Sequence, residues 1–176
     1  MKIGFDAKRA FNNKSGLGNY SRNLIRGIIK NNPKEDYFLF NSESSRYKLQ
    51  DFLEKRSNIH LVEPQSFWAK EFPGWWRSYG ITKNANHLHL DIYHGLSNEI
   101  PELPNAVKKV VTIHDVIFHK LPKTFPFIDR QMYAYKTKKA CHIADAIVVV
   151  SEQSKHDLIE LTKTPEEKIH VVYPTW

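Results

Sequence analysis

Residues 2–30 carry the sequence KIGFDAKRAFNNKSGLGNYSRNLIRGIIK, and this stretch decides the fold class. Lys2–Phe5 is a short, mostly apolar run, which is typical of a buried strand. From Leu17 to Lys30, leucine and isoleucine recur on one helical face, which predicts an amphipathic helix. Two glycines, Gly16 and Gly18, lie at the junction. A strand that enters a helix through such a turn predicts the opening of a βαβ unit.

The rest of the chain repeats this alternation of strand and helix. Further strands are predicted at Tyr37–Phe40, Ile59–Val62, Asp91–Tyr93, Lys108–Ile113, Ala146–Val150 and Ile169–Val172. Helices are predicted at Ser45–Lys55, Phe127–Ile143 and Glu152–Thr162. The pattern predicts the α/β class, as a Rossmann-like three-layer domain with a mainly parallel sheet of about seven strands. We expect residues 1–176 to form one such domain.

Ligands of a parallel sheet covered by helices on both faces bind outside the carboxyl ends of its strands. The unusual residues of this chain follow predicted strands, so we expect them to share that edge. They occur in five segments, namely Asp6–Asn19, His94-Gly95-Leu96-Ser97-Asn98, His114-Asp115, Ser151 and Tyr173-Pro174.

The glycine-containing turn could bind a phosphate group. Gly16 and Gly18 would let the backbone approach a ligand, and the first N–H groups of the helix could hold a diphosphate without a side-chain cation. The alternative is a purely structural turn. The segment is not a dinucleotide fingerprint, because its third glycine position falls on Ser21, and it lacks the ending of a Walker loop.

His114-Asp115 comes directly after the predicted strand Lys108–Ile113. A histidine there can donate a hydrogen bond to a sugar hydroxyl or move a proton, although it could instead be structural. The nine histidines show no spacing of a known zinc motif, so we expect no metal site.

Composition limits the class of protein. The chain is 41% hydrophobic and 26% charged, an ordinary balance for a globular domain. Its first residues lack a signal peptide, and its apolar runs are too short to span a bilayer, so we expect a cytoplasmic protein. The single cysteine, Cys141, fits a reducing compartment and is expected to be a buried thiol.

The net charge of +7 could attract nucleic acid, anionic lipids or charged small ligands. Its densest cluster, formed by Arg130, Lys136, Lys138 and Lys139, is either a solvated helix face or a contact for an anionic membrane. An aromatic stripe allows three interpretations: core, acceptor-binding wall or membrane contact. The stripe consists of Trp68, Phe72, Trp75, Trp76 and Tyr79, interrupted by Pro73-Gly74. Nucleic-acid binding has little support, because no basic groove is interleaved with these rings.

Three stretches together resemble the bacterial family-four, or "group 1", retaining glycosyltransferases. The resemblance covers nearly the whole chain in order. It rests on Ile3–Lys8 with Ser15–Leu24, on the histidine strand Val111–Asp115, and on Ala144–Lys155 with Lys168–Pro174. It implies the amino-terminal half of a GT-B enzyme, which mainly binds the acceptor, while a carboxyl-terminal domain binds most of the nucleotide-sugar donor.

Several roles follow from the resemblance. Gly16 and Gly18 would approach the donor diphosphate, His114 would contact the transferred sugar, and Asp115 and Ser151 would line the cleft. The family is metal-independent, so no cofactor is expected, and it retains the anomeric configuration. The acceptor would be a glycan or a lipid-linked sugar.

The chain departs from the family in lacking the second domain with its paired-glutamate motif, so we expect this part alone to be inactive. The alternative function is a stand-alone module that binds a nucleotide or phosphosugar without catalysis.

Overall fold

The computed structural model describes residues 1–43, 48, 51, 53, 54 and 56–174. Their chain divides into two compact units. Unit 1 comprises Met1–Leu96 and Pro101–Lys108, and unit 2 comprises Ser97–Ile100 and Lys109–Trp176. The helix predicted at Ser45–Lys55 falls largely outside the described residues.

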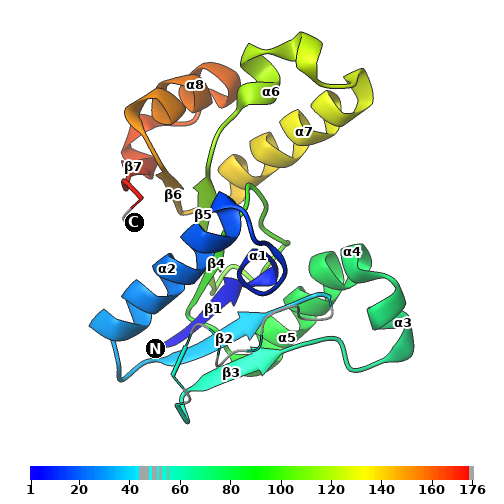
Figure 1. Cartoon of the computed structure of the whole chain (residues 1–176), viewed down its shortest axis with the longest axis vertical. Coiled ribbons are helices and arrows are strands. Elements are labelled where there is room, and N and C mark those ends of the chain that lie inside the picture. Colours follow the sequence, from blue (N-terminus) through cyan, green and yellow to red (C-terminus); the bar gives the residue numbers. More distant parts are fainter. Residues whose placement is uncertain (44–47, 49–50, 52, 55, 175–176) are drawn as a thin grey trace. The chain divides into compact units, whose positions relative to one another are not determined.

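Unit 1 is built on parallel strands in the order β3-β2-β1-β4 (Figure 1). The strands are β1 (Lys2–Asp6), β2 (Asp36–Phe40), β3 (Ile59–Val62) and β4 (Ile92–Gly95). Helices α1 (Lys8–Asn12) and α2 (Gly16–Asn31) connect β1 to β2. The crossover from β3 to β4 contains α3 (Phe67–Glu71), α4 (Pro73–Trp75), the π-helix η2 (Trp76–Gly80) and α5 (Ile81–Leu88). This strand order is that of a Rossmann half.

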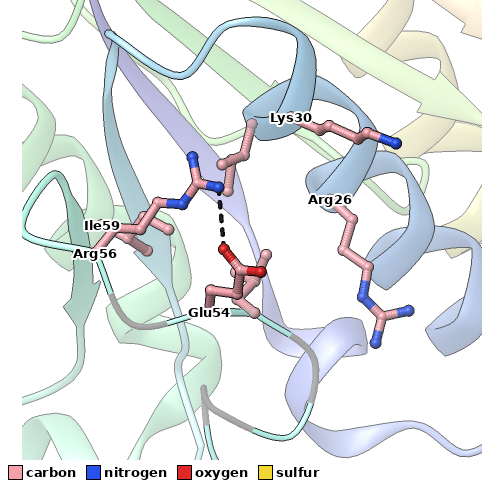
Figure 2. Close-up of a pocket in the computed structure, with 7 residues that line it drawn as sticks. Arg26, Lys30, Glu54, Arg56 and Ile59 are labelled. Carbon is pink, nitrogen blue, oxygen red and sulfur yellow. Dashed lines mark hydrogen bonds and ion pairs between the residues drawn. The ribbon is translucent and has the colours of Figure 1, made fainter.

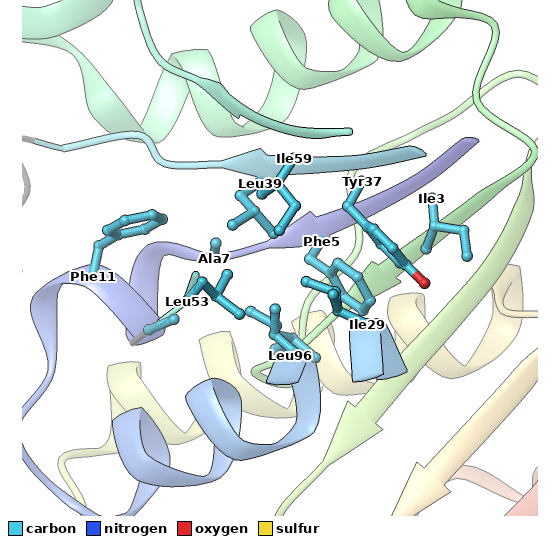
Figure 3. Packing of buried hydrophobic residues seen from close by; sticks show 12 residues of the cluster. Ile3, Phe5, Ala7, Phe11, Ile29, Tyr37, Leu39, Leu53, Ile59 and Leu96 are labelled. Carbon is cyan, nitrogen blue, oxygen red and sulfur yellow. The ribbon is translucent and has the colours of Figure 1, made fainter. Parts of the chain in front are cut away.

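One face of the unit 1 sheet packs against α1 and α2 (Figure 3). Alternate residues of β1 and β2 point to this face, since side chains along a strand alternate between the two sides. Ile3 and Phe5 of β1 and Tyr37 of β2 meet Ile25 and Ile29 of α2 in one buried cluster. Apolar residues that alternate along β1 and β2 therefore pack in the same core as the apolar residues that recur along one face of α2.

The other face of this sheet carries a second set of buried aromatic residues. The Phe40 ring lies 6.5 Å from the ring of Trp76 in η2 and 5.8 Å from that of Tyr93 in β4. Because both faces are covered, β1 is buried along nearly all its length. This explains why its sequence is almost continuously apolar.

A buried ion pair fastens the carboxyl end of β1 to η2. Asp6 is 4% exposed, and its Oδ2 accepts a hydrogen bond of 3.0 Å from Nε of Arg77 and a second bond from Nη2. The Oδ1 atom of Asp6 accepts a bond of 3.3 Å from the Lys8 N–H, where α1 begins. The carboxylate therefore holds three segments together at the edge where β1 ends.

Unit 2 contains parallel strands in the order β5-β6-β7. They are β5 (Lys108–Ile113), β6 (Ala146–Val149) and β7 (Ile169–Val171). The first crossover contains α6 (Ile117–Lys120), the 3-10 helix η3 (Pro122–Thr124) and α7 (Phe127–Ile143). The second contains α8 (Glu152–Thr162) and the 3-10 helix η4 (Glu166–Lys168). Ser151 caps α8 by accepting a bond of 3.1 Å from the Ser154 N–H.

The predicted fold class, a Rossmann-like α/β architecture with parallel strands, is confirmed. Several predicted elements are shifted by one residue at an end, and two differences are larger. β4 extends to His94 and Gly95, which were expected in the following loop, and α1 forms inside the expected loop Asp6–Asn19. None of the helices among the described residues is long and apolar enough to cross a membrane.

Loss of the Arg77 guanidinium should destabilise unit 1. We expect Arg77→Met to lower the free energy of unfolding by about 3 kcal/mol, because it leaves the Asp6 carboxylate buried and unpaired. Chemical denaturation followed by circular dichroism measures the change. Arg56→Met is the matched control, since Arg56 makes an exposed ion pair with Glu54 that contributes about 1 kcal/mol at most. An Arg77→Met variant as stable as the control would contradict the assigned role of the pair.

Candidate functional site

The predicted glycine turn lies at the start of α2, in unit 1. Ser15 is the N-cap residue of this helix, but its side chain does not cap a helix N–H. Its Oγ and its backbone N–H instead donate to Oδ1 of Asn13, each over 2.6 Å. The start of a helix carries partial positive charge. Because the Ser15 side chain is bonded to Asn13, it does not cover this positive end of α2.

Gly18 has a structural reason to be glycine. It is buried, and a Cβ atom there would lie 1.9 Å from the backbone oxygen of Asn13 and 3.1 Å from that of Arg9. The same Asn13 oxygen accepts a hydrogen bond of 3.0 Å from the Arg22 guanidinium, which also donates to the Ala10 oxygen over 2.8 Å. Arg22 therefore holds the end of α1 against α2, where Gly18 has no side chain to keep the two helices apart.

Gly16 differs from Gly18. It is exposed, and a Cβ atom there would meet no atom within 4 Å. Neither glycine has a positive φ angle. The fold therefore needs glycine at position 18 for close packing but does not need it at position 16.

In unit 2, the segment after β5 is held from two sides through its backbone. The Asn98 Oδ1 accepts a hydrogen bond of 3.1 Å from the His114 N–H, and its Nδ2 donates to the Asp115 oxygen over 3.3 Å. Asn98 itself has a left-handed backbone, with φ of 58°. Its own N–H donates to the Thr112 oxygen over 3.0 Å, so it is anchored to β5.

The second support comes from the start of α8. The Ser154 Oγ donates a hydrogen bond of 3.0 Å to the His114 oxygen, and the Ser151 Oγ lies 3.0 Å from the Ser154 Oγ. Predicted residues His114, Asp115 and Ser151 are therefore brought together at the carboxyl ends of β5 and β6. Gly16 and Gly18 belong to unit 1.

Asp115 is exposed, whereas His114 is half-buried. The Asp115 Oδ1 accepts a hydrogen bond of 3.1 Å from the Ile117 N–H, which places it at the start of α6. The aspartate thus has a local structural role besides any role toward a ligand. Asn98 was expected at the ligand edge, as part of residues 94–98, but no role was predicted for it, and Ser154 was not predicted as a functional residue. A small amide residue shortly after β4, and a second serine three positions after Ser151, are the signals that could have identified their roles.

Burial shifts the pKa values of two groups, His94 and Cys141, away from their ordinary values. Burial lowers the pKa of His94, at the end of β4, from 6.5 to about 4, so its imidazole is neutral at physiological pH. Its ring packs 5.9 Å from that of Phe5. Burial raises the pKa of Cys141 to about 11, and this residue is only 2% exposed. The prediction of a buried thiol is confirmed.

One group of side chains in α8 has atoms close enough for a metal ion. Ligand atoms of His156, Asp157 and Glu160 lie within 4.8 Å of one another. Lys120 forms ion pairs with Asp157 over 3.2 Å and with Glu160 over 2.5 Å. An ammonium group therefore already satisfies both carboxylates, and the cluster does not make a convincing cation site.

A surface pocket in unit 1 lies away from the predicted loops (Figure 2). It is lined by Arg26 and Lys30 from the carboxyl-terminal half of α2 and by Glu54, Arg56 and Ile59. Ile59 begins β3, so this pocket lies near the amino ends of the strands. The Arg56 guanidinium donates to the Glu54 carboxylate over 3.1 Å. The pocket is cationic, but it is at the opposite end of the sheet from the glycine turn.

The predicted aromatic stripe does not form a single face. Trp76 is 4% exposed and belongs to the core, whereas Phe72, Trp75 and Tyr79 are more than half exposed. The side chain of Trp68 lies outside the described part of the chain. The stripe is broken because α3, α4 and η2 are separate short elements and η2 has π-helical rather than α-helical spacing.

Comparison with known proteins identifies a family and a fold. The family model for Glycosyltransferase Family 4 matches residues 14–175. No curated protein matches the sequence significantly. Two similar solved structures are those of Alr3699/HepE from Anabaena, one in complex with UDP and one in complex with UDP and glucose.

Both HepE structures align with the whole chain at a TM-score of 0.63. The sequence identities are 12% and 13%, so the likeness establishes the fold alone. The alignment covers 44% and 45% of the HepE chains. The present chain thus spans less than half the length of these structures.

The two glycines of α2 should respond differently to a methyl group. We expect Gly18→Ala to destabilise the protein by about 1 to 3 kcal/mol, because the new Cβ would collide with the Asn13 carbonyl. Gly16→Ala should be neutral or stabilising by up to about 1 kcal/mol, since alanine favours the helix and meets open space. Thermal unfolding of both variants measures the difference. Equal melting temperatures would show that the backbone contact at Gly18 is not tight.

Proposed function

The chain belongs to glycosyltransferase family 4, and on that premise we propose that it is the acceptor-binding half of a GT-B enzyme. The complete enzyme transfers a sugar from a nucleotide-diphosphate donor to a glycan or lipid-linked acceptor, with retention of the anomeric configuration. The observation that carries the proposal is the family match over residues 14–175. A second domain would bind most of the donor, and residues 1–176 alone would be inactive. The partial coverage of the HepE chains supports this division.

The start of α2 is proposed to approach the donor diphosphate. Gly16 is exposed and leaves the backbone accessible there, whereas Gly18 is buried against the Asn13 carbonyl and brings α1 close to this helix end. The helix end supplies N–H donors and partial positive charge. Of the two glycines, Gly16 provides the stronger support, because no contact within the fold explains its missing side chain. HepE has been solved with UDP, which fits a nucleotide-linked donor.

His114 is proposed to contact the transferred sugar. Its backbone is held by Asn98 and Ser154, so the position of the side chain is supported by two elements. Asp115 and Ser151 are proposed to line the same ligand surface of unit 2. A positioned imidazole can donate a hydrogen bond to a sugar hydroxyl without a metal ion, in keeping with the proposed metal-independent and cofactor-free reaction.

The enzyme is proposed to act in the cytoplasm in polysaccharide biosynthesis, with peripheral contact at the anionic inner face of the membrane. The net charge of +7 supports attraction to anionic lipids. A lipid-linked acceptor would be presented at that surface.

Replacement of His114 tests its proposed role directly. In a protein that carries both domains, we expect His114→Ala to lower turnover by roughly ten- to a thousandfold, the usual size of one polar or acid–base contribution to a transition state. Turnover per folded molecule is measured together with the melting temperature. His170→Ala is the control, because His170 is an exposed histidine of unit 2 in β7. A reduced melting temperature with unchanged turnover would show that His114 is structural.

The donor role of α2 is tested by Gly16→Val. We expect this variant to lower kcat/KM for the nucleotide-sugar at least roughly tenfold, because the side chain would occupy space needed by the diphosphate. Folding should change little, since valine costs only about 0.5 kcal/mol more than alanine in a helix. Gly27→Val is the matched control: Gly27 also lies in α2, with no atom within 4 Å of its added Cβ. Equal kcat/KM values for Gly16→Val and Gly27→Val would show that the donor does not bind at this end of α2.

A further inference from the structure

The outer face of α7 carries apolar side chains where a solvated helix would carry polar ones. Ile128, Met132 and Tyr135 are 78%, 42% and 66% exposed. They are spaced by four and three residues, so they lie along one side of the helix. Phe127, in the first turn, is 66% exposed. We call Phe127, Ile128, Met132 and Tyr135, together with Lys138 one turn further on, the α7 outer face.

The fold of unit 2 uses the opposite side of α7. Thr137, Ala140 and Cys141 are its buried residues. Nearer the start of the helix, the Tyr133 ring lies 5.8 Å from Phe118 of α6 and 6.3 Å from Phe125. The inner side therefore supplies the packing that holds α7 in place (Figure 1). The exposed apolar residues add nothing to that core.

The charge around this face is positive. Six Lys and Arg residues but only one acidic residue, Asp129, lie between Ile117 and Ile143. Two of the six are ion-paired with residues outside this segment, Lys120 with Asp157 and Glu160 and Lys136 with Glu99. Lys138 is exposed on the outer face itself. The Arg130 guanidinium lies 5.3 Å from the centre of the exposed Phe127 ring, which pairs a cation with an apolar surface.

We propose that the α7 outer face docks the protein on the surface of an anionic lipid bilayer. An apolar stripe bordered by Lys and Arg is the arrangement of helices that lie in the membrane interface. The acyl region would cover Ile128, Met132 and Tyr135, while the headgroups would meet Lys138 and Arg130. Lipid fits better than a protein partner because the stripe combines apolar area with positive charge, which matches the acyl region and the anionic headgroups of one surface. The proposal deepens the proposed function, since a lipid-linked acceptor would reach the enzyme at this surface.

Binding to vesicles tests the proposal without any sugar transfer. The chain is sedimented with vesicles of phosphatidylcholine containing phosphatidylglycerol, and with vesicles of phosphatidylcholine alone. We expect binding to the anionic vesicles that weakens with salt and is at least tenfold weaker on the neutral vesicles. The double variant Ile128→Ser/Tyr135→Ser should lose at least tenfold in binding to the anionic vesicles.

The exposed aromatic residues of unit 1 provide the matched control. Trp75 and Tyr79 are 57% and 64% exposed, so Trp75→Ser/Tyr79→Ser removes a comparable apolar area from another surface. The affinity of this control for the anionic vesicles should lie within about twofold of that of the unchanged chain, because distant substitutions have small effects on one another's sites. Equal losses in the two double variants would overturn the assignment to α7.

A second measurement does not depend on the folding of a double variant. Ile128→Cys is labelled with an environment-sensitive fluorophore, and Cys141 stays unlabelled because it is buried. The label should shift to the blue with anionic vesicles, whereas a label on Lys34→Cys, an exposed position of unit 1, should not.

No shift at position 128, or no binding to anionic vesicles, would overturn the proposal. A concentration-dependent dimer that the α7 substitutions abolish would show that a second copy covers this face. Failure of the His114→Ala prediction leaves this test unaffected, because vesicle binding involves no turnover.

Discussion

Burial of β1 on both faces is the constraint on which unit 1 depends. β1 pairs with β2 on one side and β4 on the other. Its residues alternate between the face covered by α2 and the face that carries Phe40 and Tyr93. A strand buried in this way can end only where its backbone groups find new partners, because unpaired buried N–H groups are costly. At the end of β1, the Ala7 N–H donates to the Phe40 oxygen and the Asp6 carboxylate meets Arg77. These bonds therefore fix the carboxyl end of β1, which α1 and the glycine turn follow in the chain.

In unit 2, neutral side chains bind the backbone groups at the end of β5. Asn98 and Ser154 bond to the backbone of His114 and Asp115. An asparagine is suited to this task because its amide both accepts and donates, and because it tolerates the left-handed backbone observed here. These bonds fix the main chain of His114 and Asp115 at the carboxyl end of β5.

Most of the regular elements could be predicted from periodicity, because each long helix or strand carries its own pattern. α7 and α8 begin and end where the sequence predicts, and β3 and β5 also match. The region from Phe67 to Gly80 could not be predicted, since short helices and a π-helix have no common period. For the site, the sequence indicated Gly16, Gly18, His114, Asp115 and Ser151 as candidates. It placed Asn98 at the expected ligand edge but did not indicate its bonds, nor those of Ser154, because these bonds join segments that are far apart in the chain.

The contacts of each candidate separate what the fold requires from what it leaves unexplained. The Asn13 carbonyl accounts for the glycine at position 18, so Gly18 by itself gives little support to a ligand. Gly16 has no such contact, so the packing of α2 does not require glycine there. At His114 the bonds from Asn98 and Ser154 involve the backbone N–H and oxygen, which any residue except proline would supply. These bonds account for the position of the main chain at the end of β5 and not for the choice of histidine.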